Sequence, residues 1–121
     1  MRQAAAIAVA LIAACTAADH GPISTVTVMN GGRINFLGLV KELSPSEVSA
    51  FAGHWENKQE TTVDSNTLNG FDYMIDISGG KKPGRWQYKI TGEATFLDPK
   101  KHTVYKISNV QGFNKLIGVG Q

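Results

Sequence analysis

The chain has 121 residues, the length of one domain, and its single cysteine excludes an intrachain disulfide. A domain of this size buries roughly two thirds of its unfolded surface, so it can fold without covalent cross-links. A formal net charge of +2 and the lack of a sustained basic stripe argue against nucleic-acid binding.

The N-terminus has the features of a secretory signal. Residues 4–14 form an uncharged apolar run behind Arg2, shorter than the roughly 20 residues of a transmembrane helix but typical of a signal peptide. The run closes on Ile12-Ala13-Ala14-Cys15, which resembles the lipobox of bacterial lipoprotein signal peptides. The resemblance implies that residues 1–14 are removed on export and that Cys15 carries a lipid anchor.

The same resemblance implies a location. Thr16, rather than an aspartate, follows the cysteine, and in diderm bacteria this favours delivery to the outer membrane with the domain facing the periplasm. The alternative is an ordinary secretory signal cut after Ala18, which would leave a soluble periplasmic or secreted protein. The membrane, through Cys15, is therefore the first expected partner.

Residues 15–22 are small and polar and include a Gly-Pro pair, so we expect a short tether before a single β-rich domain over residues 23–121. Residues 23–29 are rich in β-branched side chains and predict a strand. Asn30-Gly31 predicts a tight hairpin turn, with the return strand over residues 33–40.

One short helix is predicted next. Ser44-Pro45-Ser46-Glu47 has the pattern of a capping box with proline at the first helical position. Val48, Phe51 and Trp55 recur at helical spacing and indicate one apolar face. Gly53 predicts a stop after about two turns.

The clearest strand covers residues 71–78, where apolar and polar side chains alternate. After a loop at residues 79–84, a single long strand is expected over residues 86–96. Pairing Ser78 with Arg85 places the apolar side chains of both strands on one face.

A turn is expected at Asp98-Pro99-Lys100-Lys101, which pairs Glu93 with Lys106, and a last strand is expected over residues 113–119. We therefore predict a mainly β (α+β) fold. It consists of an antiparallel meander of about five to seven strands with one short helix, arranged as a small sandwich or partial barrel.

Nothing in the sequence indicates catalysis. His20, His54 and His102 lack the spacing of metal ligands. There is no nucleophile elbow, phosphate-binding loop or second thiol. Asp72 and Asp76 would share a strand face with basic neighbours, where ion pairs are expected rather than acid–base chemistry. The sequence predicts no enzyme activity, metal site or cofactor.

The loop at residues 79–84 is the preferred contact surface. Lys81 and Lys82 stand between glycines, with Arg85 at the flank, so the three cations are expected to project from a rigid hairpin. We therefore predict non-catalytic binding of another envelope protein. Accessory, secretion or assembly, inhibitor, and immunity or exclusion roles all remain open.

The alternative is a ligand carrier. Gly53-His54-Trp55 resembles the Gly-x-Trp signature of lipocalin-like barrels, which implies a cavity for a small apolar ligand. The aromatic candidates for its lining are Trp55, Tyr73, Trp86, Tyr88 and Tyr105. About five strands are predicted after the signature, fewer than the eight of such a barrel. An aromatic-lined cavity of about 300 Å³ or more would favour the carrier, and a filled core would favour a protein-binding domain.

Overall fold

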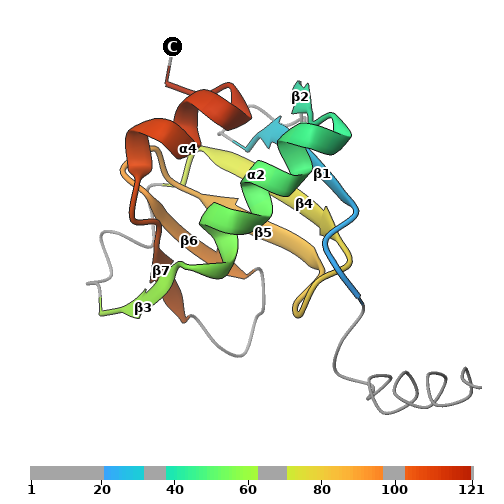
Figure 1. Cartoon of the computed structure of the whole chain (residues 1–121). Coiled ribbons are helices and arrows are strands. Elements are labelled where there is room, and N and C mark those ends of the chain that lie inside the picture. The colour runs from blue at the N-terminus through green and yellow to red at the C-terminus, as the bar shows by residue number, and fades with distance from the viewer. Residues whose placement is uncertain (1–20, 32–37, 63–70, 97–102, 121) are drawn as a thin grey trace, which may run out of the picture.

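The computed structural model describes residues 21–31, 38–62, 71–96 and 103–120. An antiparallel sheet of seven strands, in the order β2-β1-β4-β5-β6-β7-β3, carries helices on one face (Figure 1). The elements in chain order are β1 (Thr25–Asn30), β2 (Leu39–Glu42), α2 (Pro45–Glu56), β3 (Gln59–Thr61), β4 (Tyr73–Ser78), β5 (Gly84–Tyr88), β6 (Glu93–Phe96), β7 (Val104–Lys106) and α4 (Val110–Ile117). The predicted mainly β (α+β) fold is confirmed, with a helix in place of the last predicted strand.

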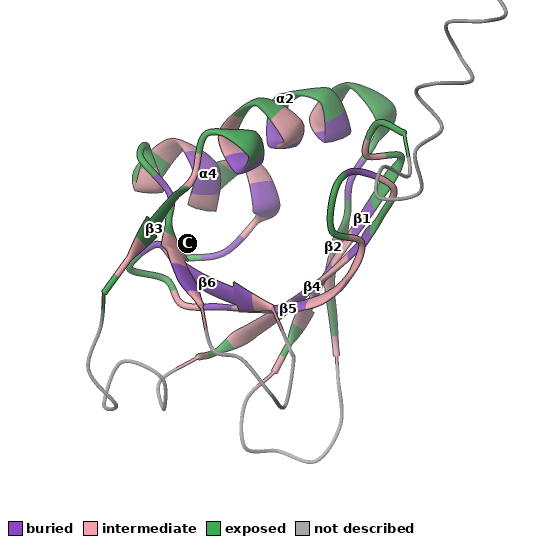
Figure 2. Ribbon diagram, turned by 90° about the horizontal axis from the view of Figure 1, so that it is seen from below, coloured by how far each residue is buried: buried purple, intermediate pink, exposed green. Residues whose placement is uncertain are grey.

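The hydrophobic core fills the space between the sheet and the two helices, where the buried parts of both layers face each other (Figure 2). The sheet contributes Ile75, Trp86 and Tyr88, and the helices contribute Phe51 and Phe113, all of them at most 1% exposed. Each large apolar side chain buried in this way stabilises the fold by about 1.5–3 kcal/mol before entropy is counted.

Helix α2 begins with the predicted capping box. The Ser44 hydroxyl accepts the amide of Glu47 at 3.3 Å, and the Glu47 carboxylate accepts the amide of Ser44 at 2.9 Å. The predicted stop at Gly53 is wrong, because burial of Trp55 in the core favours one further turn. Asn57 closes that turn by donating its side-chain amide to the carbonyl of Gly53 at 2.8 Å.

The strand predicted over residues 113–119 is wrong, since this segment forms most of α4. The Asn109 side chain accepts an amide of the first turn at 3.0 Å, and Gly118 ends the helix with a φ of +80°. Phe113 and Ile117, four residues apart, point together into the core. The interpretation as a strand overlooked both helix-capping residues.

The β4–β5 hairpin differs from the predicted register by two residues. Asp76, rather than Ser78, lies opposite Arg85. Gly79 and Gly80, both with a φ of +82°, turn the chain out of the strand, and the direct pairing of Asp76 with Arg85 favours this register. A shift of two keeps every side chain on its predicted face, so the core is unaffected.

The single long strand expected on the far side of this hairpin is also wrong. The chain turns between β5 and β6, where the amide of Gly92 donates to the carbonyl of Lys89 at 2.7 Å and Gly92 has a φ of +106°. Ile90, in this turn, is 37% exposed rather than in the core. The predicted pairing of Glu93 with Lys106 across β6 and β7 is confirmed.

Strands β1 and β2 pair as an antiparallel hairpin, but Asn30-Gly31 is not its tight turn. The return strand predicted over residues 33–40 shares only Leu39 and Val40 with β2, and residues 33–37 lie outside the described ranges. Met29 pairs with Leu39, and the amide of Asn30 donates to the carbonyl of Gly38 at 2.8 Å, so the connection is longer than two residues. Strand β1 pairs with β4 on its other edge. The sheet therefore holds this hairpin without the predicted turn.

Several predictions concern residues outside the described ranges. They include the signal peptide at residues 1–14, the anchor at Cys15 and the turn at residues 98–101. These stay predictions. Over the described part of the chain, no helix has the length and apolar character needed to cross a membrane.

Candidate functional site

A pocket of about 290 Å³ opens at the C-terminal end of α2, beside the loop that joins β4 to β5. Residues from α2 and just after it, from the β4–β5 loop, from β5 and from β7 form its walls. They are Trp55, Glu56, Lys58, Lys81, Lys82, Trp86 and Tyr105, and we call this site the lysine pocket. Only the folded chain brings these segments together.

The ammonium group of Lys58 lies against three aromatic rings. Its Nζ is 4.4 Å from the ring centroid of Trp55, 4.9 Å from that of Trp86 and 5.0 Å from that of Tyr105. The same Nζ donates a hydrogen bond to the main-chain carbonyl of Trp55 at 3.3 Å. The two indole rings meet edge to face at 4.9 Å and form a rigid wall, so the position of the ammonium group is well defined.

Burial lowers the pKa of Lys58 to about 8, because a desolvated ammonium group is disfavoured. The carboxylate of Glu56 opposes this shift, whereas the positive charges of Lys81 and Lys82 add to it. Within the described residues, Lys58 forms no ion pair with a carboxylate. The lysine pocket therefore has an excess of positive charge.

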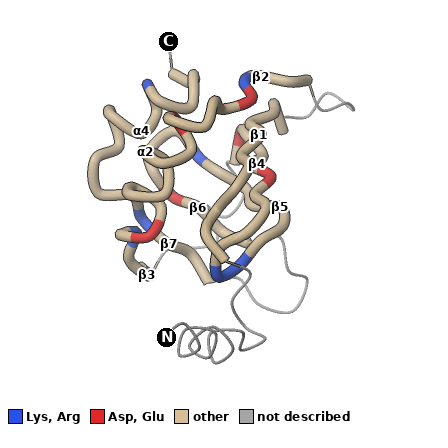
Figure 3. The backbone as a smooth tube through the Cα atoms, turned by 45° about the vertical axis from the view of Figure 1, so that its right-hand side comes forward, with Lys and Arg blue, Asp and Glu red and all other residues tan. Residues whose placement is uncertain are grey.

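The loop that carries Lys81 and Lys82 is attached at two points. The indole N–H of Trp86 donates to the carbonyl of Lys82 at 3.2 Å, and the amide of Gly80 donates to the carbonyl of Gly21 at 2.8 Å. Lys81 and Lys82 lie in the connection between β4 and β5, where Figure 3 shows the tube in blue. Their exposed side chains thus project from a fixed backbone.

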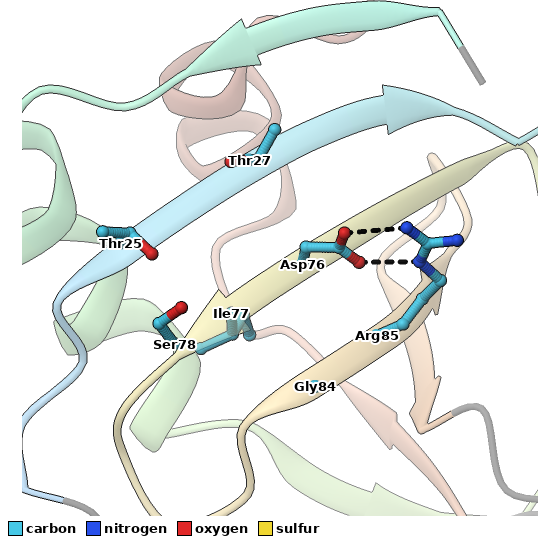
Figure 4. Close-up of a pocket in the computed structure, with 7 residues that line it drawn as sticks. All are labelled: Thr25, Thr27, Asp76, Ile77, Ser78, Gly84 and Arg85. Carbon is cyan, nitrogen blue, oxygen red and sulfur yellow. Dashed lines mark hydrogen bonds and ion pairs between the residues drawn. The ribbon is translucent and has the colours of Figure 1, made fainter.

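Arg85 lies on the opposite face of the sheet from the lysine pocket. Its Nε and a terminal nitrogen each donate to an oxygen of Asp76 at 2.8 Å, and Asp76 raises the pKa of Arg85 (Figure 4). The pair lies in a shallow hollow of about 400 Å³. Its lining is Thr25, Thr27, Asp76, Ile77, Ser78, Gly84 and Arg85, and we call it the outer hollow. The structure brings Lys81 and Lys82 together but separates them from Arg85.

The five aromatic candidates for a ligand cavity also divide. Trp55, Trp86 and Tyr105 line the lysine pocket. Tyr88 is completely buried elsewhere in the core, where burial raises its pKa and its hydroxyl donates to the side chain of Asn114. Tyr73 is half-buried and packs against the core beside it.

Two charged residues of the lysine pocket, Lys58 and Glu56, were missed in the sequence. Both lie shortly after Gly53, the residue at which the helix was predicted to end. With the helix ending at Glu56, Lys58 comes two residues after that end, and its Nζ reaches back to the carbonyl of Trp55. The wrong helix end therefore concealed the central cation of the site.

The described residues contain no group of three or more histidine, cysteine, aspartate or glutamate side chains able to hold a metal ion. His54 instead packs edge-on against the ring of Phe113 at 5.8 Å. His20 and His102 lie outside the described ranges. Asp76 forms the ion pair expected of it.

No protein-family model, curated protein or solved structure matches the chain. The chemistry of the lysine pocket must therefore be inferred from its own residues. Three ammonium groups, one carboxylate and an aromatic wall suit the binding of a negatively charged group better than that of a neutral or positive one.

Proposed function

We propose that this chain is a lipid-anchored envelope protein whose domain captures an acidic segment of another envelope protein in the lysine pocket. The observation that carries the proposal is that Lys58 lies over the rings of Trp55 and Trp86 in a pocket that Lys81 and Lys82 also line. Aromatic residues and cations of this kind contribute strongly to protein interfaces, and complementary charge speeds association. The role is binding, with no catalytic step.

The carrier of a small apolar ligand is the second candidate, and the aromatic lining of the lysine pocket supports it. Its volume of about 290 Å³ is at the lower end of ligand pockets, which run from roughly 300 to 1,000 Å³. The charged groups at its mouth would have to be desolvated by a neutral ligand without compensation. An anionic partner group compensates them, and for this reason we favour protein binding.

The place of the lysine pocket relative to the proposed anchor supports a membrane-proximal partner. The loop bearing Lys81 and Lys82 is hydrogen-bonded to Gly21. Five residues lie between Cys15 and Gly21, and the six steps of chain that join the two span at most about 20 Å. An acylated Cys15 would therefore keep the lysine pocket close to the periplasmic surface of the outer membrane, where a membrane-bound partner is concentrated.

The anchor is tested by Cys15→Ser. Without the thiol no acyl chain can be attached, so we expect the variant in the soluble periplasmic fraction and the wild type in the membrane fraction. A Cys15→Ser protein that still sediments with membranes after a high-salt wash would show that the anchor is wrong. The substitution leaves every residue that lines the lysine pocket unchanged.

The binding site is tested by a pull-down of the lipidated protein from membranes, with mass spectrometry of the proteins that co-purify. The double variant Lys81→Glu, Lys82→Glu should fold and lose the partner. Lys89→Glu, Lys115→Glu changes the net charge equally at sites away from the lysine pocket and should retain it. If both variants fold and both capture the partner as well as the wild type does, the 79–84 loop is not the contact.

A further inference from the structure

We propose that Lys58 is the anchor of the lysine pocket and that the group it binds is a single carboxylate, the side chain of an aspartate or glutamate of the partner. Lys81 and Lys82 then hold the acidic residues next to it. This inference rests on the proposed function and names the residue and the ligand chemistry that would carry it.

The first argument is the lack of a counter-ion. Lys41 and Lys106, two other lysines that bridge elements, pair with carboxylates at 2.7 and 3.2 Å. Lys58 is half-buried like Lys41, yet among the described residues its only hydrogen bond is to a neutral carbonyl oxygen, and the nearby carboxylate of Glu56 forms no ion pair with it. An ammonium group has three donors, and a desolvated cation without a counter-ion is unfavourable. The open space beside it has room for the missing anion.

The second argument is preorganisation. A free lysine side chain loses about 2 kcal/mol of rotamer entropy when it is immobilised, and this weakens most surface ion pairs. The rings of Trp55, Trp86 and Tyr105 already hold Nζ of Lys58 within 4.4 to 5.0 Å of their centroids. Much of the ordering cost is thus met before the partner arrives, so Lys58 suits the role of anchor better than exposed Lys81 or Lys82.

The third argument concerns the kind of anion. Phosphate sites in proteins typically surround the group with arginine forks or arrays of backbone N–H groups that share several oxygens, and a lysine adds a point charge to such a set. Here one ammonium group lies inside the lysine pocket, and Arg85 is on the other face of the sheet. A singly charged carboxylate matches one buried cation, and a run of acidic residues matches the two lysines at the mouth.

Binding should depend on the protonation of Lys58. The other ionisable groups around it are Glu56 of α2, Lys81 and Lys82 of the hairpin loop, and Tyr105 of β7, with Glu60 of β3 opposite Tyr105. The pKa of Lys58 is about 8 in the free protein, and a bound carboxylate must raise it. Affinity should therefore change little between about pH 6 and pH 7, where Lys58 is protonated and the carboxylates are ionised, and fall by up to about tenfold per unit above pH 8.

The test uses the peptide acetyl-Asp-Glu-Asp-Glu-amide and its neutral counterpart acetyl-Asn-Gln-Asn-Gln-amide. Trp55 and Trp86 are the only two tryptophans of the chain, and both line the lysine pocket, so tryptophan fluorescence reports binding there. NMR of the protein labelled at the lysine side chains gives the pKa of Lys58 with and without peptide. Inorganic phosphate is titrated in parallel.

We expect the acidic peptide alone to bind and to raise the pKa of Lys58. Lys58→Met, which still covers the rings, should lower affinity by about tenfold or more and abolish the fall above pH 8, and Lys58→Arg should bind at all these pH values. An unchanged pKa of Lys58 together with full affinity of Lys58→Met would overturn the inference. Tighter binding of phosphate than of the peptide would overturn the assignment to a carboxylate.

These outcomes are separable from those of the proposed function. If Lys58→Met captures the natural partner normally while Lys81→Glu, Lys82→Glu does not, the binding role stands and the anchor role of Lys58 fails. If neither variant affects capture, the lysine pocket is not the partner site.

Discussion

Lys82 and Arg85 are three residues apart on one hairpin, and the two hollows to which they belong differ in the state of their charges. In the outer hollow, Arg85 forms a two-point ion pair with Asp76, and both charges are compensated within the fold. In the lysine pocket, Lys58 has no carboxylate partner among the described residues, and two further lysines stand at the mouth. The proposed binding site is therefore distinguished by a cation without an ion-pair partner, and its size does not distinguish it. The outer hollow is the larger of the two.

The largest expected effect concerns the wall that the lysine pocket shares with the core. Trp86→Ala removes a side chain that is 1% exposed and should lower the free energy of unfolding by about 3–5 kcal/mol, through lost burial and a new cavity. Ile90→Ala is the control, since Ile90 is 37% exposed and should cost below about 1 kcal/mol. Denaturant melts measure both. A small loss for Trp86→Ala would mean that the indole serves the ligand rather than the fold.

The next largest effect tests which of the two hollows binds the acidic peptide. Lys81→Gln, Lys82→Gln should weaken binding of the acidic peptide by about tenfold and reduce its salt dependence, because two rim charges of about 0.7 kcal/mol each are lost. Arg85→Gln should leave the affinity unchanged, since the arginine is already paired. Fluorescence titrations at low and high salt measure both variants. A similar loss of affinity in the double lysine variant and in Arg85→Gln would contradict the assignment of binding to the lysine pocket alone.

A pH profile tests whether the cation of the lysine pocket is uncompensated. The pKa of Lys58 is about 8 in the folded chain against 10.5 as a free side chain, so between these values the unfolded state binds more protons. The free energy of unfolding should therefore rise from pH 8 to pH 9.5, and the rise should be absent in Lys58→Met. Measurements stop at pH 9.5 because tyrosines of the unfolded chain ionise near 10. Parallel profiles for the two proteins would mean that Lys58 is fully solvated.

The smallest effect is expected in the outer hollow. Asp76→Asn breaks a pair whose side chains are 38–39% exposed, so the free energy of unfolding should fall by about 0.2–1 kcal/mol, and less at high salt. Partner capture should not change. Loss of capture by a folded Asp76→Asn variant would make the outer hollow part of the contact surface.

The sequence already contained the reason why Arg85 and the lysine pocket lie on opposite faces of the sheet. Side chains alternate along a strand, so Arg85 and Trp86 must lie on opposite faces once β5 is recognised. Grouping Arg85 with Lys81 and Lys82 by proximity in the chain ignored that alternation. The three aromatic side chains around Lys58, by contrast, belong to α2, β5 and β7, and no local sequence pattern relates them.

Features that depend on neighbouring residues followed from the sequence alone. The capping box at Ser44 is an example, since its donors and acceptors are three residues apart. The alternation in β4 and the pairing of Glu93 with Lys106 are others, because short connections limit the possible registers. These signals were sufficient for the fold class and for placing Lys81 and Lys82 in the connection between β4 and β5.

Only the tertiary structure decided the end of α2, the helical state of residues 110–117 and the assembly of the lysine pocket. Burial of Trp55 extends α2 past Gly53, and burial of Phe113 and Ile117 against the sheet stabilises α4, although each segment is short enough to be ambiguous by itself. The rings around Lys58 come from positions up to 47 residues away in the chain, and the order of the strands brings them close to it. Contacts between residues so far apart in the chain depend on how the whole domain packs, and local sequence patterns do not predict that packing.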